Sequence, residues 1–285
     1  MAPDPGRAKS ADYRAPKIRG GEVSNDQIKK ILLSLRKTGH DFSVILSGKK
    51  SGKVHGLYKP DSREIIIHNK NFKNDNELMY TAIHEYAHHL QFTGSAVPVS
   101  AKAHTTAFWS LFHELLFEAE RTGFYHSPFE GIPAFAELTR EIREKFLTTS
   151  GSLMKELGRL LLRAHELCEQ HGTSFGDYVD RVLGLPRTSA QVIMKAHRLD
   201  LDPRVGFENM RQLTTIRDDG DRAKAQTALL SGRTPDMVKA AYGSRPKPKD
   251  PRAELEEERS RIRRTIRRLQ ERLKEIDRRL DGGKE

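Results

Sequence analysis

The first hydrophobic pattern along the chain predicts a helix followed by a small sheet. Apolar residues recur at helical spacing after capping side chains at 24–26, and this helix is expected to end near Gly39. Runs of β-branched and aromatic residues then predict three strands, with the glycine-containing segment 47–52 as a hairpin turn between the first two. The predicted strands are 42–46, 54–58 and 64–68.

Two further helices are expected to complete this unit, over residues 21–126. Helical spacing is present at Leu78 and ends near Gly94, and it resumes at Phe108 after a turn through 95–100. The order helix, small sheet, helix, helix predicts an α+β fold. Residues 1–20 lack periodicity and are rich in alanine, proline, glycine and basic side chains, which predicts a disordered basic tail.

Residues 127–243 have helical spacing and predict an all-α domain. A long helix at 154–170 precedes a short helix, a break at Gly184 and a second short helix. This arrangement is typical of a helix-turn-helix unit, whose crossing helices bury apolar residues. The apolar residues at those positions are Val179, Leu183, Leu185, Ala190 and Ile193. An ordinary helical hairpin is the alternative, and Asp180 favours it because a small residue is usual there.

The last part of the chain predicts a coiled coil over residues 252–281, after a basic linker at 244–251. One apolar series repeats every seven residues, and a second series occupies the other core position, with Arg259 as its exception. The members are Leu255, Ile262, Leu269 and Ile276, then Ile266, Leu273 and Leu280. A homodimer through this helix is expected. The alternative is a helix that packs on its own chain or stays single.

Composition limits the partners and the compartment. The net charge is +11 and the pI about 9.7, which favours a polyanion such as DNA without separating it from an acidic protein. Cys168 is the single cysteine, so an intrachain disulfide is excluded and a cytoplasmic location is expected. No run approaches 18 apolar residues, and we expect no membrane association.

The segment 84–88 contains the chemistry of a metal site, in a His-Glu-x-x-His pattern within a predicted helix. Positions four apart share one helix face, so His84 and His88 can both reach one ion, with Glu85 beside them. A catalytic zinc site takes three protein ligands and leaves a place for water, whose proton a neighbouring carboxylate can accept. His89 points about 100° round the helix, so we expect it to pack or to orient a neighbour.

A third ligand is expected at the start of the following helix. His104 lies there, and the intervening chain is long enough to turn back. Glu114 or Glu118 is the alternative third ligand. An edge strand beside the metal would hold the substrate backbone, and Tyr58 and Tyr86 are candidates for donating a hydrogen bond to the oxyanion.

These motifs together resemble the SprT-like metalloprotease domain, which includes Wss-type and Spartan-type proteases. The likeness rests on the His-Glu-x-x-His helix, a short loop and His-x-x-x-Phe-Trp at 104–109, and it extends over roughly residues 22–125. It implies zinc on His84, His88 and His104 and catalysis by Glu85. Thr105 stands where many members have glycine, and the C-terminal zinc ribbon of some members is absent.

The segment around Gly184 resembles the helix-turn-helix of phage- and plasmid-type DNA-binding domains. The resemblance implies that its second helix exposes side chains suited to phosphates and base edges in the major groove. These side chains are Arg187, Thr188, Ser189, Gln191, Val192 and Lys195.

Two functional classes follow. The first is a zinc metallopeptidase recruited to DNA that cleaves DNA-bound or crosslinked protein. The second is a DNA-binding regulator of a phage or mobile element, whose metallopeptidase cleaves a specific repressor or itself. A zinc site with only a structural role is a third alternative.

Overall fold

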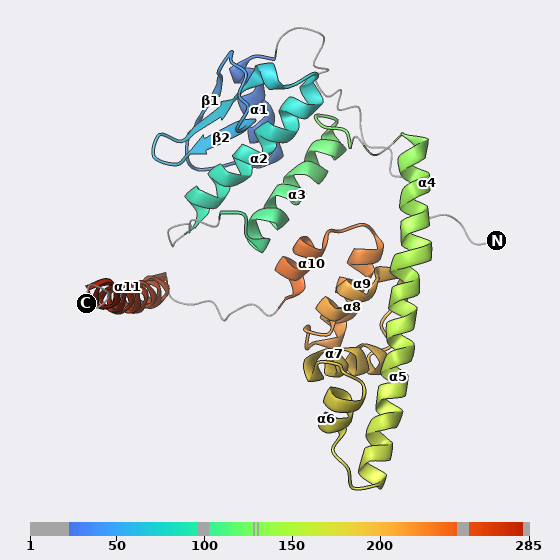
Figure 1. The fold of residues 1–285 in the computed structure, drawn as a ribbon. Helices are drawn as coiled ribbons and strands as arrows, with labels where there is room; N and C mark the ends of the chain where they lie inside the picture. The colour runs from blue at the N-terminus through green and yellow to red at the C-terminus, as the bar shows by residue number, and fades with distance from the viewer. Residues whose placement is uncertain (1–22, 96–102, 128, 130, 244–250, 282–285) are drawn as a thin grey trace, which may run out of the picture.

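The computed structural model describes residues 23–95, 103–127, 129, 131–243 and 251–281. It is mostly helical with one small three-stranded mixed sheet, in agreement with the α+β class expected (Figure 1). The predicted basic tail at 1–20, the centre of the turn at 95–100 and nearly all of the linker at 244–251 lie outside the described residues. Among the described residues, no helix is long and apolar enough to cross a membrane.

The N-terminal part packs helices against the sheet. Helix α1 begins at a capping box formed by Ser24 and Gln27, and it ends at Leu35, earlier than expected. Its apolar positions share one core with the sheet and with α2 and α3, over residues 23–125. The elements are α1 (Asn25–Leu35), β1 (Ser43–Leu46), β2 (Gly56–Lys59), β3 (Glu64–Ile67), a 3-10 turn (Asn69–Asn71), α2 (Asp75–Gly94) and α3 (Thr106–Thr122).

The sheet order is β1-β3-β2, and the hairpin predicted at 47–52 is wrong. Strand β3 lies in the centre, parallel to β1 and antiparallel to β2. Segment 47–52 is tied instead to the 3-10 turn that follows β3. Gly48 N–H donates to Asn69 Oδ1 at 2.9 Å, and Asn71 exchanges bonds with the Ser51 backbone at 2.8 and 2.9 Å. These bonds hold segment 47–52 against the turn that follows β3. Strand β2 pairs with β3 on one side, and its other edge, next to α2, is not paired with a strand within the described ranges.

A single long helix runs from Pro133 to Gln170 beside the smaller helices of the second part (Figure 1). The joints at Ile142 and Thr149 keep right-handed helical backbone angles, so the chain does not break there. Gly158 is required where α7 crosses, because a Cβ would lie 2.6 Å from the Ile193 carbonyl oxygen. The segments are α4 (Pro133–Glu141), a π-helical stretch (Ile142–Thr148) and α5 (Thr149–Gln170).

The expected short helix, glycine break and second helix are present around Gly184, which has φ +63°. Val179, Ala190 and Ile193 are buried and Leu185 is half-buried, as predicted. Leu183 is 38% exposed, so its predicted burial is wrong. The helix closes as a π turn in which Leu183 N–H bonds to Tyr178 O, and the wider turn rotates Leu183 off the buried face. The segments are α6 (Phe175–Asp177), the π turn (Tyr178–Val182) and α7 (Arg187–Arg198).

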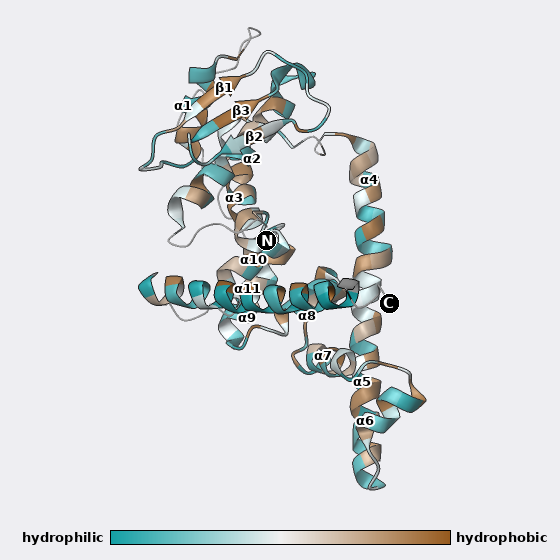
Figure 2. Cartoon of the chain, turned by 60° about the vertical axis from the view of Figure 1, so that its left-hand side comes forward, coloured by the Kyte–Doolittle hydropathy of each residue, from teal (hydrophilic) through white to brown (hydrophobic). Residues whose placement is uncertain are grey.

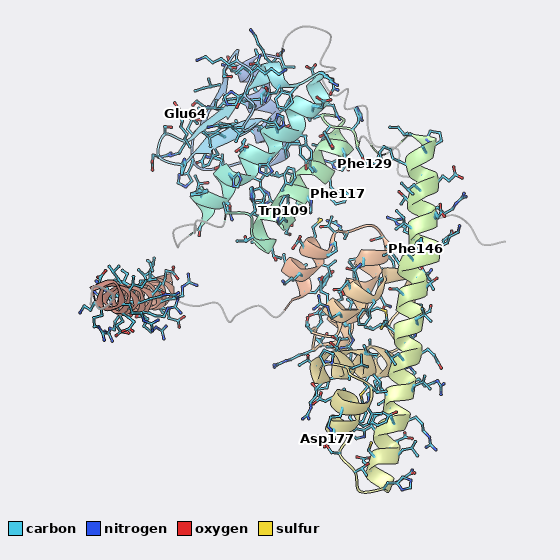
Figure 3. All side chains as sticks on the ribbon, in the orientation of Figure 1. Glu64, Trp109, Phe117, Phe129, Phe146 and Asp177 are labelled. Atoms are coloured by element: carbon cyan, nitrogen blue, oxygen red, sulfur yellow. The ribbon has the colours of Figure 1, made fainter. Side chains whose placement is uncertain are left out.

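Three more helices complete the second part, and α10 joins it to α3. His113 Nδ1 on α3 lies 3.0 Å from Thr234 Oγ1. The Arg233 guanidinium lies 5.9 Å from the centre of the ring of Phe117, which is labelled on α3 in Figure 3. Gly220 lies in the first turn of α9, which Asp218 caps. The helices are α8 (Phe207–Leu213), α9 (Asp219–Leu230) and α10 (Pro235–Tyr242). Helix α11 (Pro251–Asp281) follows after residues 244–250.

Candidate metal centre

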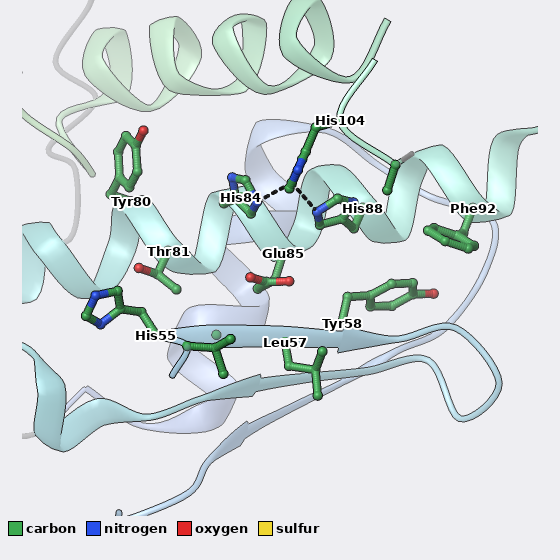
Figure 4. Close-up of a pocket in the computed structure, with 13 residues that line it drawn as sticks. His55, Leu57, Tyr58, Tyr80, Thr81, His84, Glu85, His88, Phe92 and His104 are labelled. Atoms are coloured by element: carbon green, nitrogen blue, oxygen red, sulfur yellow. Dashed lines mark hydrogen bonds between the residues drawn. The ribbon is translucent and has the colours of Figure 1, made fainter. Parts of the chain in front are cut away.

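Three imidazoles converge where α2 passes the start of α3. His84 and His88 lie one turn apart on α2, and His104 stands two residues before α3. His104 Nε2 lies 3.1 Å from Nε2 of each of the other two rings (Figure 4). Imidazole nitrogens bound to one tetrahedral ion at 2.0–2.1 Å would be about 3.3 Å apart. The three side chains could therefore hold a metal ion, and they are the one such group among the described residues.

Aromatic side chains of α3 hold the three rings in place. Phe108 stacks on His88 with ring centres 4.3 Å apart and meets the edges of the other two rings. Trp109 stacks on His104 at 5.5 Å. Since both side chains belong to the first turn of α3, the register of that helix sets the positions of the ligand rings.

Burial favours the neutral form of two of the candidate ligands, His84 and His88. The pKa of His84 is lowered to about 4 by burial and by the neighbouring His88 and His104, and that of His88 is lowered to about 4 by burial and by His104. Both rings are therefore neutral at pH 7, with free lone pairs for a metal ion.

Gln91 is a supporting residue that the sequence did not indicate. Its amide nitrogen donates to the Ala103 carbonyl at 2.9 Å and so ties α2 to the segment that carries His104. Its amide oxygen and His88 Nδ1 are the two buried polar side-chain atoms without a partner in the described part of the chain. A hydrogen bond between these two atoms would fix the His88 tautomer with Nε2 free for the ion.

Glu85 lies between the three histidines and β2, and it is 7% exposed. Burial raises the pKa of this carboxyl to about 7, against the opposing effect of the Tyr58 backbone N–H. A cation on the histidines lowers that pKa again. A carboxyl that titrates near neutrality can both accept and return a proton.

Gly56 allows β2 to approach Glu85 this closely, which no sequence pattern indicated. A Cβ at this position would lie 2.7 Å from Thr81 Cγ2 and 2.9 Å from Glu85 Cγ. Together β2 and α2 line a groove of about 480 Å³ that contains the three histidines. Its other walls are largely apolar and aromatic, formed by Val54, Leu57, Tyr58, Tyr80 and Phe92 (Figure 4).

The remaining candidates lie away from the metal group. Glu114 pairs with Arg36 at 2.9 Å and Glu118 pairs with Arg121, so both alternative third ligands are wrong. His89 is fully buried, with Nδ1 3.1 Å from the Tyr58 hydroxyl, and it packs and orients as expected.

The two tyrosines suggested as oxyanion donors are engaged elsewhere. The Tyr58 hydroxyl is bonded to His89, and the Tyr86 hydroxyl donates to the Arg36 carbonyl. The expectation for both is therefore wrong. Both rings belong to the buried core, and the Tyr58 ring also lines the groove.

The predicted DNA-contacting side chains lie on α7, far along the chain from the metal group. Thr188, Ser189, Gln191 and Lys195 are exposed there, and Val192 is half-buried. Arg187 is exposed but bound: its Nε lies 2.6 Å from Asp180 and its terminal nitrogen 3.7 Å from Asp177. These two carboxylates offset the charge that Arg187 would offer to a phosphate.

Searches of protein-family models, characterised proteins and solved structures find no match to this chain.

Proposed function

We propose that residues 21–126 form a zinc-dependent endopeptidase of the SprT-like type. The observation that supports this most is the convergence of His84, His88 and His104 beside the buried carboxyl of Glu85, with His104 Nε2 3.1 Å from Nε2 of each of the other two rings. An all-imidazole donor set suits zinc, and three protein ligands leave one coordination place open. When bound, zinc would act as a Lewis acid on a peptide carbonyl and on water.

Glu85 is the proton carrier in this proposal. It accepts a proton from the attacking water and returns it to the leaving amine, and a pKa raised by burial suits both transfers. Gly56 on β2 lies close against the Glu85 side chain, and the Tyr58 backbone N–H is directed at its carboxyl.

The free edge of β2 is the proposed binding strand for substrate. The His55 carbonyl accepts from His68 N–H, on the β3 side, so alternation along the strand turns the Gly56 backbone groups and the Tyr58 carbonyl to the free edge, while the Tyr58 N–H is directed at Glu85. A peptide added along this edge would pass through the groove beside the histidines. Main-chain pairing of this kind accepts many sequences, which suits cleavage of varied proteins.

Recruitment to DNA is the second element of the proposal. The net charge of +11 and the exposed polar face of α7 support it, with Lys195 among the exposed cations on that face. The substrate would then be a protein bound or crosslinked to DNA.

The test is a casein-cleavage assay on the zinc-loaded full chain, with and without DNA. Glu85→Gln is expected to keep its zinc and to lose at least 10³-fold in rate, because the proton acceptor is removed. Glu118→Gln is the matched control, since this carboxylate lies in an exposed pair with Arg121, and it should cleave normally. Native-rate cleavage by Glu85→Gln would contradict the proposal.

A further inference from the structure

Helix α11 carries a row of apolar side chains that the described part of the chain does not cover. Each is between 44% and 58% exposed, and Figure 2 shows them as hydrophobic residues along an otherwise hydrophilic helix. The row consists of Leu255, Ile262, Ile266, Leu269, Leu273 and Ile276. A narrow stripe of this kind on a helix of 31 residues has the shape of a coiled-coil seam.

The charged residues on either side of this apolar row indicate what kind of partner would cover it. With Leu255, Ile262, Leu269 and Ile276 at heptad position d, position a falls on Arg259, Ile266 and Leu273. Position g is then Glu258, Thr265, Arg272 and Arg279, and position e is Glu256, Arg263, Gln270 and Asp277. Three of these flanking residues are acidic and three are basic, which suits a partner of mixed charge better than a polyanion.

Parallel, in-register pairing with a second copy matches these charges. In that arrangement each g residue faces the e residue five positions later on the other helix. Glu258 then faces Arg263, Thr265 faces Gln270, and Arg272 faces Asp277. Each of these three contacts between a g residue and an e residue is attractive or neutral. Arg263, Arg272 and Asp277 make no ion pair within the described part of the chain, so they are free for these contacts.

Antiparallel pairing matches them less well. There g faces g and e faces e, so Glu258 would meet Arg279, but Glu256 would meet Asp277 as a like-charge pair. Arg259 would also lie against Ile276 in the apolar seam. In the parallel arrangement Arg259 faces its own copy as one like-charge layer, beside the opposite Glu258, which offsets the repulsion. A polar residue at one a position costs stability and fixes the register.

We propose that α11 pairs with α11 of a second copy as a parallel, in-register two-stranded coiled coil. The exposed apolar row of one α11 is thus covered by the same row of another molecule. The two copies are held at corresponding ends, so both chains leave the coiled coil from the same side. This inference is independent of the proposed peptidase activity.

A cysteine placed at one a position tests the orientation in the full chain. In the parallel arrangement the two copies of Arg259→Cys face each other and should form a disulfide-linked dimer under mild oxidation. In the antiparallel arrangement the two sulfur atoms would be about 26 Å apart, since 17 helical residues separate positions 259 and 276. The native chain, whose cysteine Cys168 is buried, is the control and should not crosslink.

Charge exchange tests the register by sedimentation equilibrium. Glu258→Arg and Arg263→Glu should each weaken the dimer by about tenfold, because two attractive contacts become repulsive in the symmetric pair. The double variant should recover the native affinity, because it restores both contacts with the charges exchanged. Arg264→Glu, on the outer face one residue from Arg263, is the matched control and should associate like the native chain.

Crosslinking by Arg259→Cys together with recovery in the double variant supports the proposal. A chain that is monomeric at all concentrations would overturn it, and so would a dimer that does not crosslink. A dimer that is indifferent to these charges would do the same.

Discussion

At the scale of single residues, the site depends on how closely β2 approaches Glu85. The carboxyl is buried, its pKa is raised to about 7, and the Tyr58 backbone N–H directs it. A displacement of this carboxyl would leave the three histidines intact but move the proton acceptor, so metal binding and turnover can be separated by substitution.

Gly56→Ala is expected to lower kcat/KM by about tenfold to a hundredfold while zinc content stays at the native value. The added Cβ would lie 2.7 Å from Thr81 Cγ2 and 2.9 Å from Glu85 Cγ, so Glu85 must shift, and misplacement near 1 Å has losses of that size. Gly52→Ala is the matched control, because no atom lies within 4 Å of its Cβ. Equal activity in the two variants would show that the close approach does not matter.

The metal-free chain should lose stability as the pH falls from 6.5 towards 4. The pKa values of His84 and His88 are lowered to about 4 in the folded state, so over this range the unfolded chain binds more protons. Glu85 opposes this effect between its ordinary pKa of 4.5 and about 7, because its raised pKa makes the folded chain bind the extra proton. Two histidines outweigh one carboxyl.

Thermal unfolding of the EDTA-treated chain across this pH range measures the effect. Glu85→Gln should steepen the fall in Tm, because it removes the opposing group, and His84→Gln should make it shallower. If the native chain, Glu85→Gln and His84→Gln have the same pH dependence of Tm, the pKa values of Glu85 and His84 are not shifted in the folded state.

The ligands could be predicted from sequence, whereas their supports could not. His84 and His88 follow from helical spacing, which is local, and His104 from the length of the connection. Gly56 and Gln91 act across the fold: the first because β2 lies on Glu85, the second because α2 lies next to Ala103. Those contacts exist only after the sheet order and the helix pairing are set.

At the scale of elements, β2 is expected to act as a template for an extended substrate. N-methylation of a cleaved peptide, one residue at a time, should lower kcat/KM by about threefold to tenfold at alternate positions, where each methyl removes one main-chain bond to the free edge. An unmethylated peptide of the same sequence is the reference. Losses without a two-residue period would argue against strand addition.

The elements themselves were largely predictable, but their pairing was not. The helices at 25–35 and 75–94 follow from spacing and caps, as do the three short strands. The hairpin at 47–52 was inferred from local turn residues alone, and it fails because Asn69 and Asn71 bind that segment. Leu183 fails for a related reason: a π turn changes which residues share a face, and apolar spacing does not indicate it.

At the scale of the whole molecule, the contact between α3 and α10 connects the part that contains the three histidines with the helical part. His104, the candidate third ligand, lies just before α3. Thr234 caps α10 and also contacts His113 on α3. A DNA-binding surface on the helical part would therefore be connected to the groove through the contact between α3 and α10.

Lys195→Ala is expected to weaken DNA binding and to reduce the slope of log affinity against log salt by about 1, because one phosphate contact is lost. Lys224→Ala on α9 is the matched control, since Lys224 is an exposed lysine already near Asp221 at 3.7 Å. Fluorescence anisotropy over a range of salt concentrations gives both values. If both variants bind DNA like the native chain, α7 is not the DNA-binding surface.

The most direct test of the central claim is X-ray absorption spectroscopy at the zinc edge, on the full chain loaded with one equivalent of zinc. The expected spectrum has three imidazole nitrogens at about 2.0–2.1 Å and one further light atom, and His104→Ala should lose one nitrogen. A zinc shell without three imidazoles, or one unchanged in His104→Ala, would contradict the site.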